Sequence, residues 1–216
     1  SLIRAAAKNY FSKAVVVDKN DYKIIISEIK KNKGISLETR KKLAVKAFKR
    51  TMEYDLEIFK WFNESTENTK DNHFFLMGNK IKDLRYGENP HQSASLYKDL
   101  NGNKSPFYEQ ISGKELSFNN FNDIKSGLSL ISEFKSPTSV IIKHAIPCGV
   151  AEEKNIYNAW KKSLNADSLS AFGGVVTLNR TVDKKTALSL SKIFLEVIVA
   201  KNFTSDAIGI LSKKVI

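Results

Sequence analysis

Hydrophobic residues in the first part of the chain recur at helical spacing. A helix is expected over residues 2–9, and a second helix, capped by Asp21, is stopped by Gly34. Ser36 then opens a longer helix, whose apolar positions are Leu43, Ala47, Phe48, Tyr54, Ile58, Phe59 and Phe62. The β-branched run 14–17 predicts a buried strand.

The helical period fails between Asn63 and Asn79, where polar residues dominate, and this marks a linker or domain boundary. Beyond it, short strands alternate with helices. Strands are predicted at 93–97, 107–111, 140–143, 175–178 and 197–200, and helices from Asn122 or Asp123, near 155–164, from Asp183 and from Ser205. This alternation predicts an α/β fold with a largely parallel or mixed sheet.

Both ends of the sequence read as cut. Ser1 precedes a helix that has no strand before it, and Ile216 ends an apolar run. An α/β domain seldom ends on an uncovered sheet, so we expect a piece of a larger protein. A length of 216 residues with 42% hydrophobic residues allows one domain or parts of two.

The formal net charge of +12 raises nucleic-acid binding as a hypothesis, since Lys and Arg neutralise phosphates. The charge is spread evenly, however: 17 basic and 10 acidic residues lie at positions 1–80, leaving 18 and 13 for the rest. No ladder of aromatic residues interleaved with Arg forms a base-stacking platform. The pattern favours a lysine-rich solvated surface, and small anionic substrates remain compatible with it.

The apolar runs are too short to cross a bilayer, so no membrane association is expected. Cys148 is the single cysteine, which excludes an internal disulfide framework. No secretory leader is recognisable. We therefore expect a cytoplasmic protein.

The three histidines lie at positions 73, 91 and 144. His144 is the informative one, because Lys143 and His144 follow the apolar core of a predicted strand. In α/β sheets, ligands bind beyond the carboxyl ends of strands, so this pair would lie where substrates dock. An imidazole there could act as a general acid or base. A surface Lys-His pair at a strand end is the alternative interpretation.

Pro147-Cys148 invites comparison with the Pro-Cys-x-x-Cys half of a zinc deaminase site. That interpretation fails, because position 151 is Ala, no second cysteine exists, and Ile146 stands where the motif needs Glu. Cys148 is expected to be a small packed residue, and no metal ligand set is predicted.

Three further segments carry polar groups suited to binding. The segment 84–92 contains Arg85, whose planar guanidinium is suited to phosphate, and Tyr86, whose hydroxyl can donate a hydrogen bond. An ordinary turn is the alternative interpretation of this segment. The glycine loop at 170–174 offers N–H groups that can hold a carboxamide or phosphate, or it is a plain connection. The amide-rich segment 117–123 could be explained by helix capping alone.

Taken in order, these segments resemble one family. Residues 84–92, 116–123, 143–149 and 170–174 are similar to successive landmarks of AICAR transformylase, and residues 2–9 with 15–17 resemble the closing part of IMP cyclohydrolase. The resemblance implies that residues 1–78 are the end of an MGS-like, Rossmann-type cyclohydrolase domain with its linker. Residues 79–216 would be the first part of a cytidine-deaminase-like transformylase domain.

The resemblance also implies roles. Lys143 and His144 would be the catalytic pair of formyl transfer to AICAR, and Lys8 would belong to the cyclohydrolase site that converts FAICAR to IMP. The residues implied to bind substrate are Arg85, Tyr86, Asn120, Phe172, Gly173 and Glu196. The formyl donor would be the co-substrate 10-formyltetrahydrofolate, and the transferase site would form across a homodimer interface.

The sequence departs from the family pattern at two positions near the implied site. Ile146 replaces a small polar residue, and Lys201 stands where a proline is common. The family's chain is also well over twice this length, so we expect the isolated chain to have little or no activity. A non-catalytic nucleotide-binding α/β module, for which Arg85 and the glycine loop would suffice, is the alternative.

Overall fold

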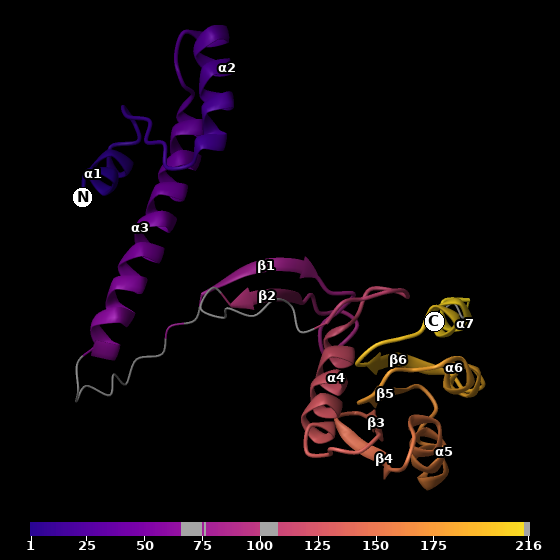
Figure 1. Ribbon diagram of the computed structural model, residues 1–216. Coiled ribbons are helices and arrows are strands. Elements are labelled where there is room, and N and C mark those ends of the chain that lie inside the picture. The colour runs from indigo at the N-terminus through magenta and orange to yellow at the C-terminus, as the bar shows by residue number, and fades with distance from the viewer. Residues whose placement is uncertain (66–74, 76, 100–107, 214–216) are drawn as a thin grey trace. The chain divides into compact units, whose positions relative to one another are not determined.

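The computed structural model describes residues 1–65, 75, 77–99 and 108–213 (Figure 1). The chain divides into two compact units, Ser1–Phe74 and Phe75–Ile216, and each is described by itself. Within the described ranges, no helix combines the length and apolar character that crossing a membrane requires.

The first unit is helical. It contains α1 (Leu2–Lys8), a short 3₁₀ helix η1 (Lys19–Asp21), α2 (Tyr22–Asn32) and the long α3 (Leu37–Ser65). Its core consists of Ala7, Val15, Ala44 and Ala47, whose small side chains let α1 pack closely on α3. Arg4 of α1 also pairs with Asp55 of α3 at 3.5 Å.

Two details of this unit differ from the sequence prediction. Residues 14–17 form no strand, and Val15 is buried against the helices, because no described strand offers its backbone a partner. Asp21 is the N-cap residue of α2, as predicted, but its side chain makes no capping hydrogen bond and pairs with Lys46 instead. Asp18 caps the preceding η1 by accepting from the Asn20 N–H at 2.9 Å. The end of α2 near Gly34 is confirmed, although Lys33 adopts the left-handed conformation there, with φ of 53°.

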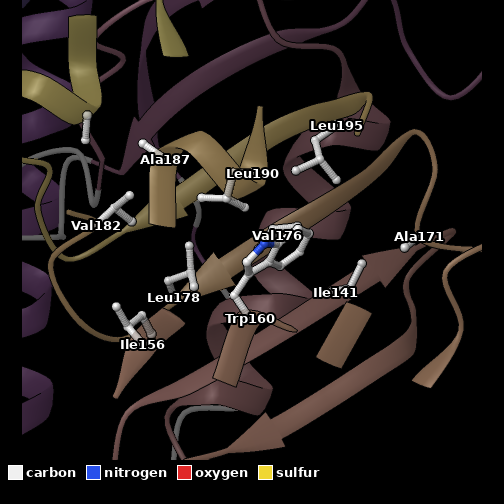
Figure 2. Packing of buried hydrophobic residues seen from close by; sticks show 11 residues of the cluster. Ile141, Ile156, Trp160, Ala171, Val176, Leu178, Val182, Ala187, Leu190 and Leu195 are labelled. Atoms are coloured by element: carbon white, nitrogen blue, oxygen red, sulfur yellow. The ribbon is translucent and has the colours of Figure 1, made fainter. Parts of the chain in front are cut away.

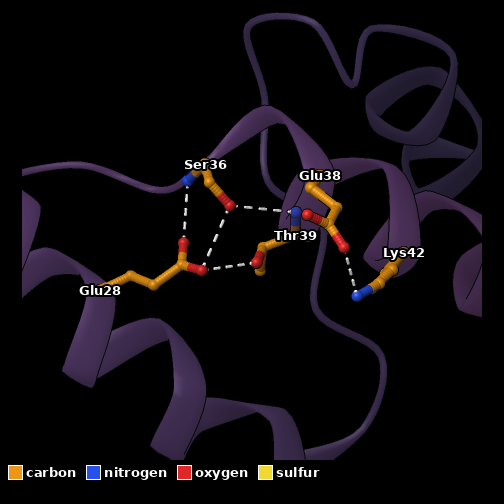
Figure 3. Close-up of polar contacts among 5 residues, drawn as sticks. All are labelled: Glu28, Ser36, Glu38, Thr39 and Lys42. Atoms are coloured by element: carbon orange, nitrogen blue, oxygen red, sulfur yellow. Dashed lines mark hydrogen bonds and ion pairs between the residues drawn. The ribbon is translucent and has the colours of Figure 1, made fainter.

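A carboxylate from α2 completes the start of α3 (Figure 3). Glu28 accepts hydrogen bonds from the Ser36 N–H at 2.8 Å, the Ser36 hydroxyl at 3.2 Å and the Thr39 hydroxyl at 2.6 Å. Ser36 in turn accepts from the Thr39 N–H at 3.2 Å, which confirms that it opens the helix. The Thr39 hydroxyl and the Ser36 N–H lower the pKa of Glu28, because both stabilise its ionised form.

This cap predicts a pH-dependent stability for the helical unit. A carboxylate whose pKa is lowered by folding stabilises the fold above its ordinary pKa and loses that effect as pH falls. We expect Glu28→Gln to lower the thermal midpoint of the helical signal in circular dichroism at pH 7. The amide nitrogen of Gln cannot accept the hydrogen bonds that one carboxylate oxygen of Glu28 accepts. The gap to wild type should narrow below pH 4.5, the ordinary pKa of Glu28. Glu64→Gln, at the exposed far end of α3, is the control, and an unchanged midpoint for Glu28→Gln at pH 7 would contradict this prediction.

The second unit contains a hairpin and a mixed sheet. Strands β1 (Gly78–Asp83) and β2 (Ser95–Asp99) pair antiparallel. The larger sheet has the order β4 (Ile146–Glu152), β3 (Thr138–Lys143), β5 (Gly174–Leu178) and β6 (Leu195–Ala200). Strand β3 is antiparallel to both neighbours, whereas β5 and β6 are parallel. The predicted α/β fold with a mixed sheet is confirmed.

Helices cover both faces of this sheet (Figure 1). Helix α4 (Phe118–Ile131) packs on the face that carries Val140, Ile142 and Val175. The helices α5 (Ile156–Ala166), α6 (Lys184–Leu190) and α7 (Ser205–Leu211) lie on the other face. Side chains of a strand alternate between faces, which explains why consecutive residues such as Val140 and Ile141 enter different clusters.

The cluster under α5 to α7 is the larger core, and Trp160 is fully buried in it (Figure 2). The cluster also contains Val176 of β5, and the indole N–H donates to the Ser189 hydroxyl at 2.9 Å. On the opposite face, Gly127 brings α4 close to the sheet. A Cβ at that position would overlap the Thr177 side chain, so the close approach requires glycine.

Several boundaries differ from the sequence prediction. Helix α4 starts at Phe118 and is capped by Ser117, not by Asn122 or Asp123, because Ser117 and Asn120 form a reciprocal capping box. Thr204, not Ser205, caps α7, whereas Asp183 caps α6 as predicted. The described residues 108–111 form no strand, and Phe107 lies outside the described residues. The strand predicted at 93–97 is β2, shifted by two residues.

Candidate functional site

The candidate site starts at the tight turn between β3 and β4. Lys143, the last residue of β3, pairs with Ile146, so the turn consists of His144 and Ala145 alone. Their φ angles of 53° and 63° are both left-handed. Positive φ at both central residues is the pattern of a type I′ hairpin turn, which Asn and Gly adopt readily, whereas in other residues it costs about 1–2 kcal/mol. The backbone that carries His144 is therefore strained, as is frequent at functional sites.

Two polar contacts hold this turn. The Asp123 carboxylate on α4 accepts a hydrogen bond from the Ala145 N–H at 2.7 Å. The Lys143 ammonium donates to the carbonyl oxygen of Phe172 at 2.9 Å, which joins the Lys-His motif to the glycine loop. The imidazole of His144 is exposed. The turn thus presents an imidazole beside an anchored ammonium group.

The glycine loop is fixed by backbone contacts. Gly173 has φ of 72° and donates to the Phe194 carbonyl at 2.9 Å, and the rings of Phe172 and Phe194 lie 5.4 Å apart. Asp167 accepts from the Ser170 N–H at 2.9 Å. Hydrogen bonds from Ser170 lower the pKa of Asp167, and the charge of Lys143 lowers it further. These contacts define the conformation of the loop.

Arg85 and Tyr86 are tied to the start of α4 through their backbones. The Arg85 N–H donates to the Leu116 carbonyl at 3.1 Å, and the Phe118 N–H donates to the Tyr86 carbonyl at 3.1 Å. The guanidinium of Arg85 lies 4.9 Å from the centre of the Tyr86 ring and donates to its hydroxyl at 3.2 Å. The pair presents one exposed cation with its phenol partner.

Asn120 and Glu196 form a polar contact between α4 and β6. Asn120 is 4% exposed, and its Nδ2 donates to Glu196 Oε2 at 2.5 Å. Its side-chain oxygen meanwhile accepts from the Ser117 backbone N–H at 3.0 Å. Because the capping box orients this carboxamide, the Glu196 carboxylate is held at a defined position.

A cavity of about 680 Å³ lies beside this contact. Arg85, Asn120, Glu196 and Phe194 are among its lining residues. Lys143, His144, Tyr86, Phe172 and Gly173 do not line it. Phe194 connects the residues that line the cavity with those that do not. It lines the cavity and also contacts both Phe172 and Gly173. The structure therefore brings the predicted residues of this unit into two adjoining groups and not into one pocket.

Lys8 lies apart from these groups in the sequence, as the exposed last residue of α1 in the first unit. Cys148 is half-buried, and its thiol lies 3.7 Å from the Ile141 carbonyl oxygen. Burial raises the pKa of this thiol and so favours its protonated form. Among the described residues, no group of three or more His, Cys, Asp or Glu side chains could hold a metal ion.

Two residues that organise this site were not among the site residues predicted from the sequence. Phe194 reads as part of an apolar run, and Asp123 was interpreted as a helix cap. Their contacts join segments far apart in the sequence, and only the amide-rich stretch around Asp123 gave any local signal. The site as a whole offers an imidazole, an ammonium group and an exposed guanidinium, groups suited to proton transfer and to binding an anionic, planar ligand.

Comparisons with known proteins agree with one another. Residues 6–215 match the family model of the AICARFT/IMPCHase bienzyme. The chain is 45% identical over 217 residues to the bifunctional purine biosynthesis protein PurH of Acetivibrio thermocellus. It is 47% identical over 215 residues to PurH of a Thermoanaerobacter species, and 44% identical over 216 residues to PurH of Listeria monocytogenes. In each comparison 99% of this chain is covered, but it spans only 42% of the relative's length.

Proposed function

This chain belongs to the AICARFT/IMPCHase bienzyme family, and from that premise we propose that it contributes to both late steps of de novo purine biosynthesis. In the first step, AICAR receives a formyl group from 10-formyltetrahydrofolate and becomes FAICAR. In the second, FAICAR closes to IMP with loss of water. Because the chain spans 42% of its relatives' length, these activities are proposed for the natural protein that contains it.

The contact that carries this proposal is the hydrogen bond from Lys143 to the Phe172 carbonyl at 2.9 Å. It joins the two segments to which formyl transfer and binding of the substrate base are proposed. In the reaction, the 5-amino nitrogen of AICAR attacks the formyl carbon, and the bond from that carbon to N10 of the folate breaks. His144 accepts the proton that leaves the amino group, and N10 gains one. Lys143 stabilises the negative charge that develops on the formyl oxygen.

The remaining groups are proposed to hold AICAR. Arg85 and Tyr86 engage the nucleotide, for which an exposed guanidinium next to a phenol is suited. Phe172 and Gly173 lie against the base and its carboxamide. The carboxylate of Glu196, held by Asn120, lines the cavity.

The ring-closing step is proposed to involve Lys8 on α1. In this step the carboxamide nitrogen joins the formyl carbon of FAICAR, and water is expelled. The exposure of Lys8 at the end of α1 leaves its ammonium group accessible to a ligand. We accordingly propose that the unit of α1 to α3 is the end of a cyclohydrolase domain, and that the sheet-containing unit begins the transformylase domain. A cytoplasmic homodimer completes the proposal.

A chimera tests this function. The corresponding segment of PurH from Acetivibrio thermocellus would be replaced by this chain, which is 45% identical to it. We expect the chimera to formylate AICAR and to form IMP, because the rest of the PurH chain then supplies the segments that lie outside these 216 residues. The 216-residue chain alone should show little or no turnover. A folded chimera that binds AICAR without turnover would contradict the proposal and favour a non-catalytic nucleotide-binding module.

A further inference from the structure

We propose that Asp123 is a positioning residue for formyl transfer, which holds the His144–Ala145 turn in its left-handed conformation and so aims His144. This inference rests on the function proposed above. Its starting point is the hydrogen bond of 2.7 Å from the Ala145 N–H to the Asp123 carboxylate. The bond joins a helix to the tip of a hairpin across 22 positions of sequence.

The turn needs an external support. Both of its residues have positive φ, at 53° and 63°, and neither is Gly or Asn. Such a conformation persists only where the surroundings over-determine it. Among the described residues, the carboxylate of Asp123 is the side chain that forms a hydrogen bond with the backbone of the turn. A charged acceptor makes this a strong hydrogen bond, so it is well placed to offset the strain.

Asp123 itself is held rigidly. The capping box of Ser117 and Asn120 fixes the start of α4 six residues earlier. One turn after Asp123, Gly127 lets the helix approach the sheet so closely that a Cβ there would overlap Thr177. Ile142, the last but one residue of β3, also lies against Gly127. The distance between the carboxylate and the turn is therefore set by helix packing, not by a flexible loop.

This arrangement also connects the two groups of the candidate site. Asn120, which orients Glu196 at the cavity, and Asp123, which holds the turn of His144, lie on the first turns of the same helix. A shift of this helix end would displace both groups together. A displacement of about 1 Å at a reacting group can lower a rate by about 100-fold.

The test uses the natural protein that contains this chain, or the active chimera. We expect Asp123→Ala to lower kcat for formyl transfer by about 10- to 100-fold, while the KM for AICAR changes much less. Asp123→Asn keeps an oxygen acceptor and should retain most of the activity. Glu133→Ala, which removes an exposed carboxylate beyond the other end of α4, is the matched control. Unchanged kcat in Asp123→Ala, or equal losses in the Ala and Asn variants, would overturn the inference.

A second measurement is independent of turnover. In the wild-type protein the exposed Ala145 amide should exchange with deuterium much more slowly than an unbonded amide, because its N–H is bound to Asp123. This protection should persist in Asp123→Asn and disappear in Asp123→Ala. Rapid exchange in wild type overturns the inference even if Asp123→Ala does not fold. A wild-type protein without formyl transfer but with a protected Ala145 amide would refute the proposed function and leave the support of the turn established.

Discussion

Replacing His144 with alanine is expected to lower kcat for formyl transfer by about 100- to 10,000-fold, the range for loss of a general acid–base group. The proposed reaction requires a base beside the attacking amino group, and the exposed imidazole of His144 is the group that the β3–β4 turn presents. The measurement is the rate of FAICAR formation by the natural protein or the active chimera at saturating AICAR and formyl donor.

Ring closure provides the internal control for this variant. The proposed cyclohydrolase residue Lys8 lies in the other unit, so His144→Ala should convert supplied FAICAR to IMP at the wild-type rate. His91→Ala is the matched control, since it removes another exposed imidazole of the same unit. Equal loss of both activities in His144→Ala would contradict the assigned role.

The largest effect on stability is expected from Trp160→Ala. Its side chain is fully buried in the cluster under α5 to α7, and its N–H is bonded to Ser189 (Figure 2). Removing such a side chain typically lowers the free energy of unfolding by about 3–5 kcal/mol, because it leaves a cavity and loses the buried contacts. Urea-induced unfolding of the second unit, followed by circular dichroism, measures this loss.

Trp160→Phe separates the contribution of the buried ring from that of the hydrogen bond to Ser189. It keeps an aromatic ring in the core but removes the donor, so the free energy of unfolding should fall clearly less than in Trp160→Ala. Leu169→Ala, at an 88% exposed position of the same unit, should leave the free energy of unfolding almost unchanged. A loss in Trp160→Ala no larger than in Leu169→Ala would show that the cluster is not the core of this unit.

The strands buried on both faces were the most predictable elements. Residues 140–143 and 175–178 are apolar or β-branched almost throughout, which is the pattern of a central strand, and β3 and β5 contain them. Strand β4 was not predicted, because its start, Ile146-Pro147-Cys148-Gly149, has the composition of a turn. It lies at the edge of the sheet, where a strand tolerates proline. The run 14–17 shows the reverse case. Its β-branched residues favour a strand, but β propensity alone cannot provide a neighbouring strand to pair with.

The candidate site was predictable only one segment at a time. Lys143, His144 and the glycine loop could each be recognised from local composition. The contact from Lys143 to Phe172, which joins two of these segments, spans 29 positions of sequence. The contact from Asn120 to Glu196 spans 76 positions. Such contacts are set by how α4 and the strands pack, which no local pattern encodes. The same holds for Asp123, whose partner lies 22 positions away.

The unfavourable backbone of the β3–β4 turn has a consequence for engineering. A campaign that selects only for thermostability would favour Asn-Gly at positions 144 and 145, because that dipeptide suits the required angles without strain. Every variant of that kind would gain a more robust hairpin and lose its imidazole. Under the function proposed here, such variants would lose formyl transfer, so His144 would have to be kept fixed during selection.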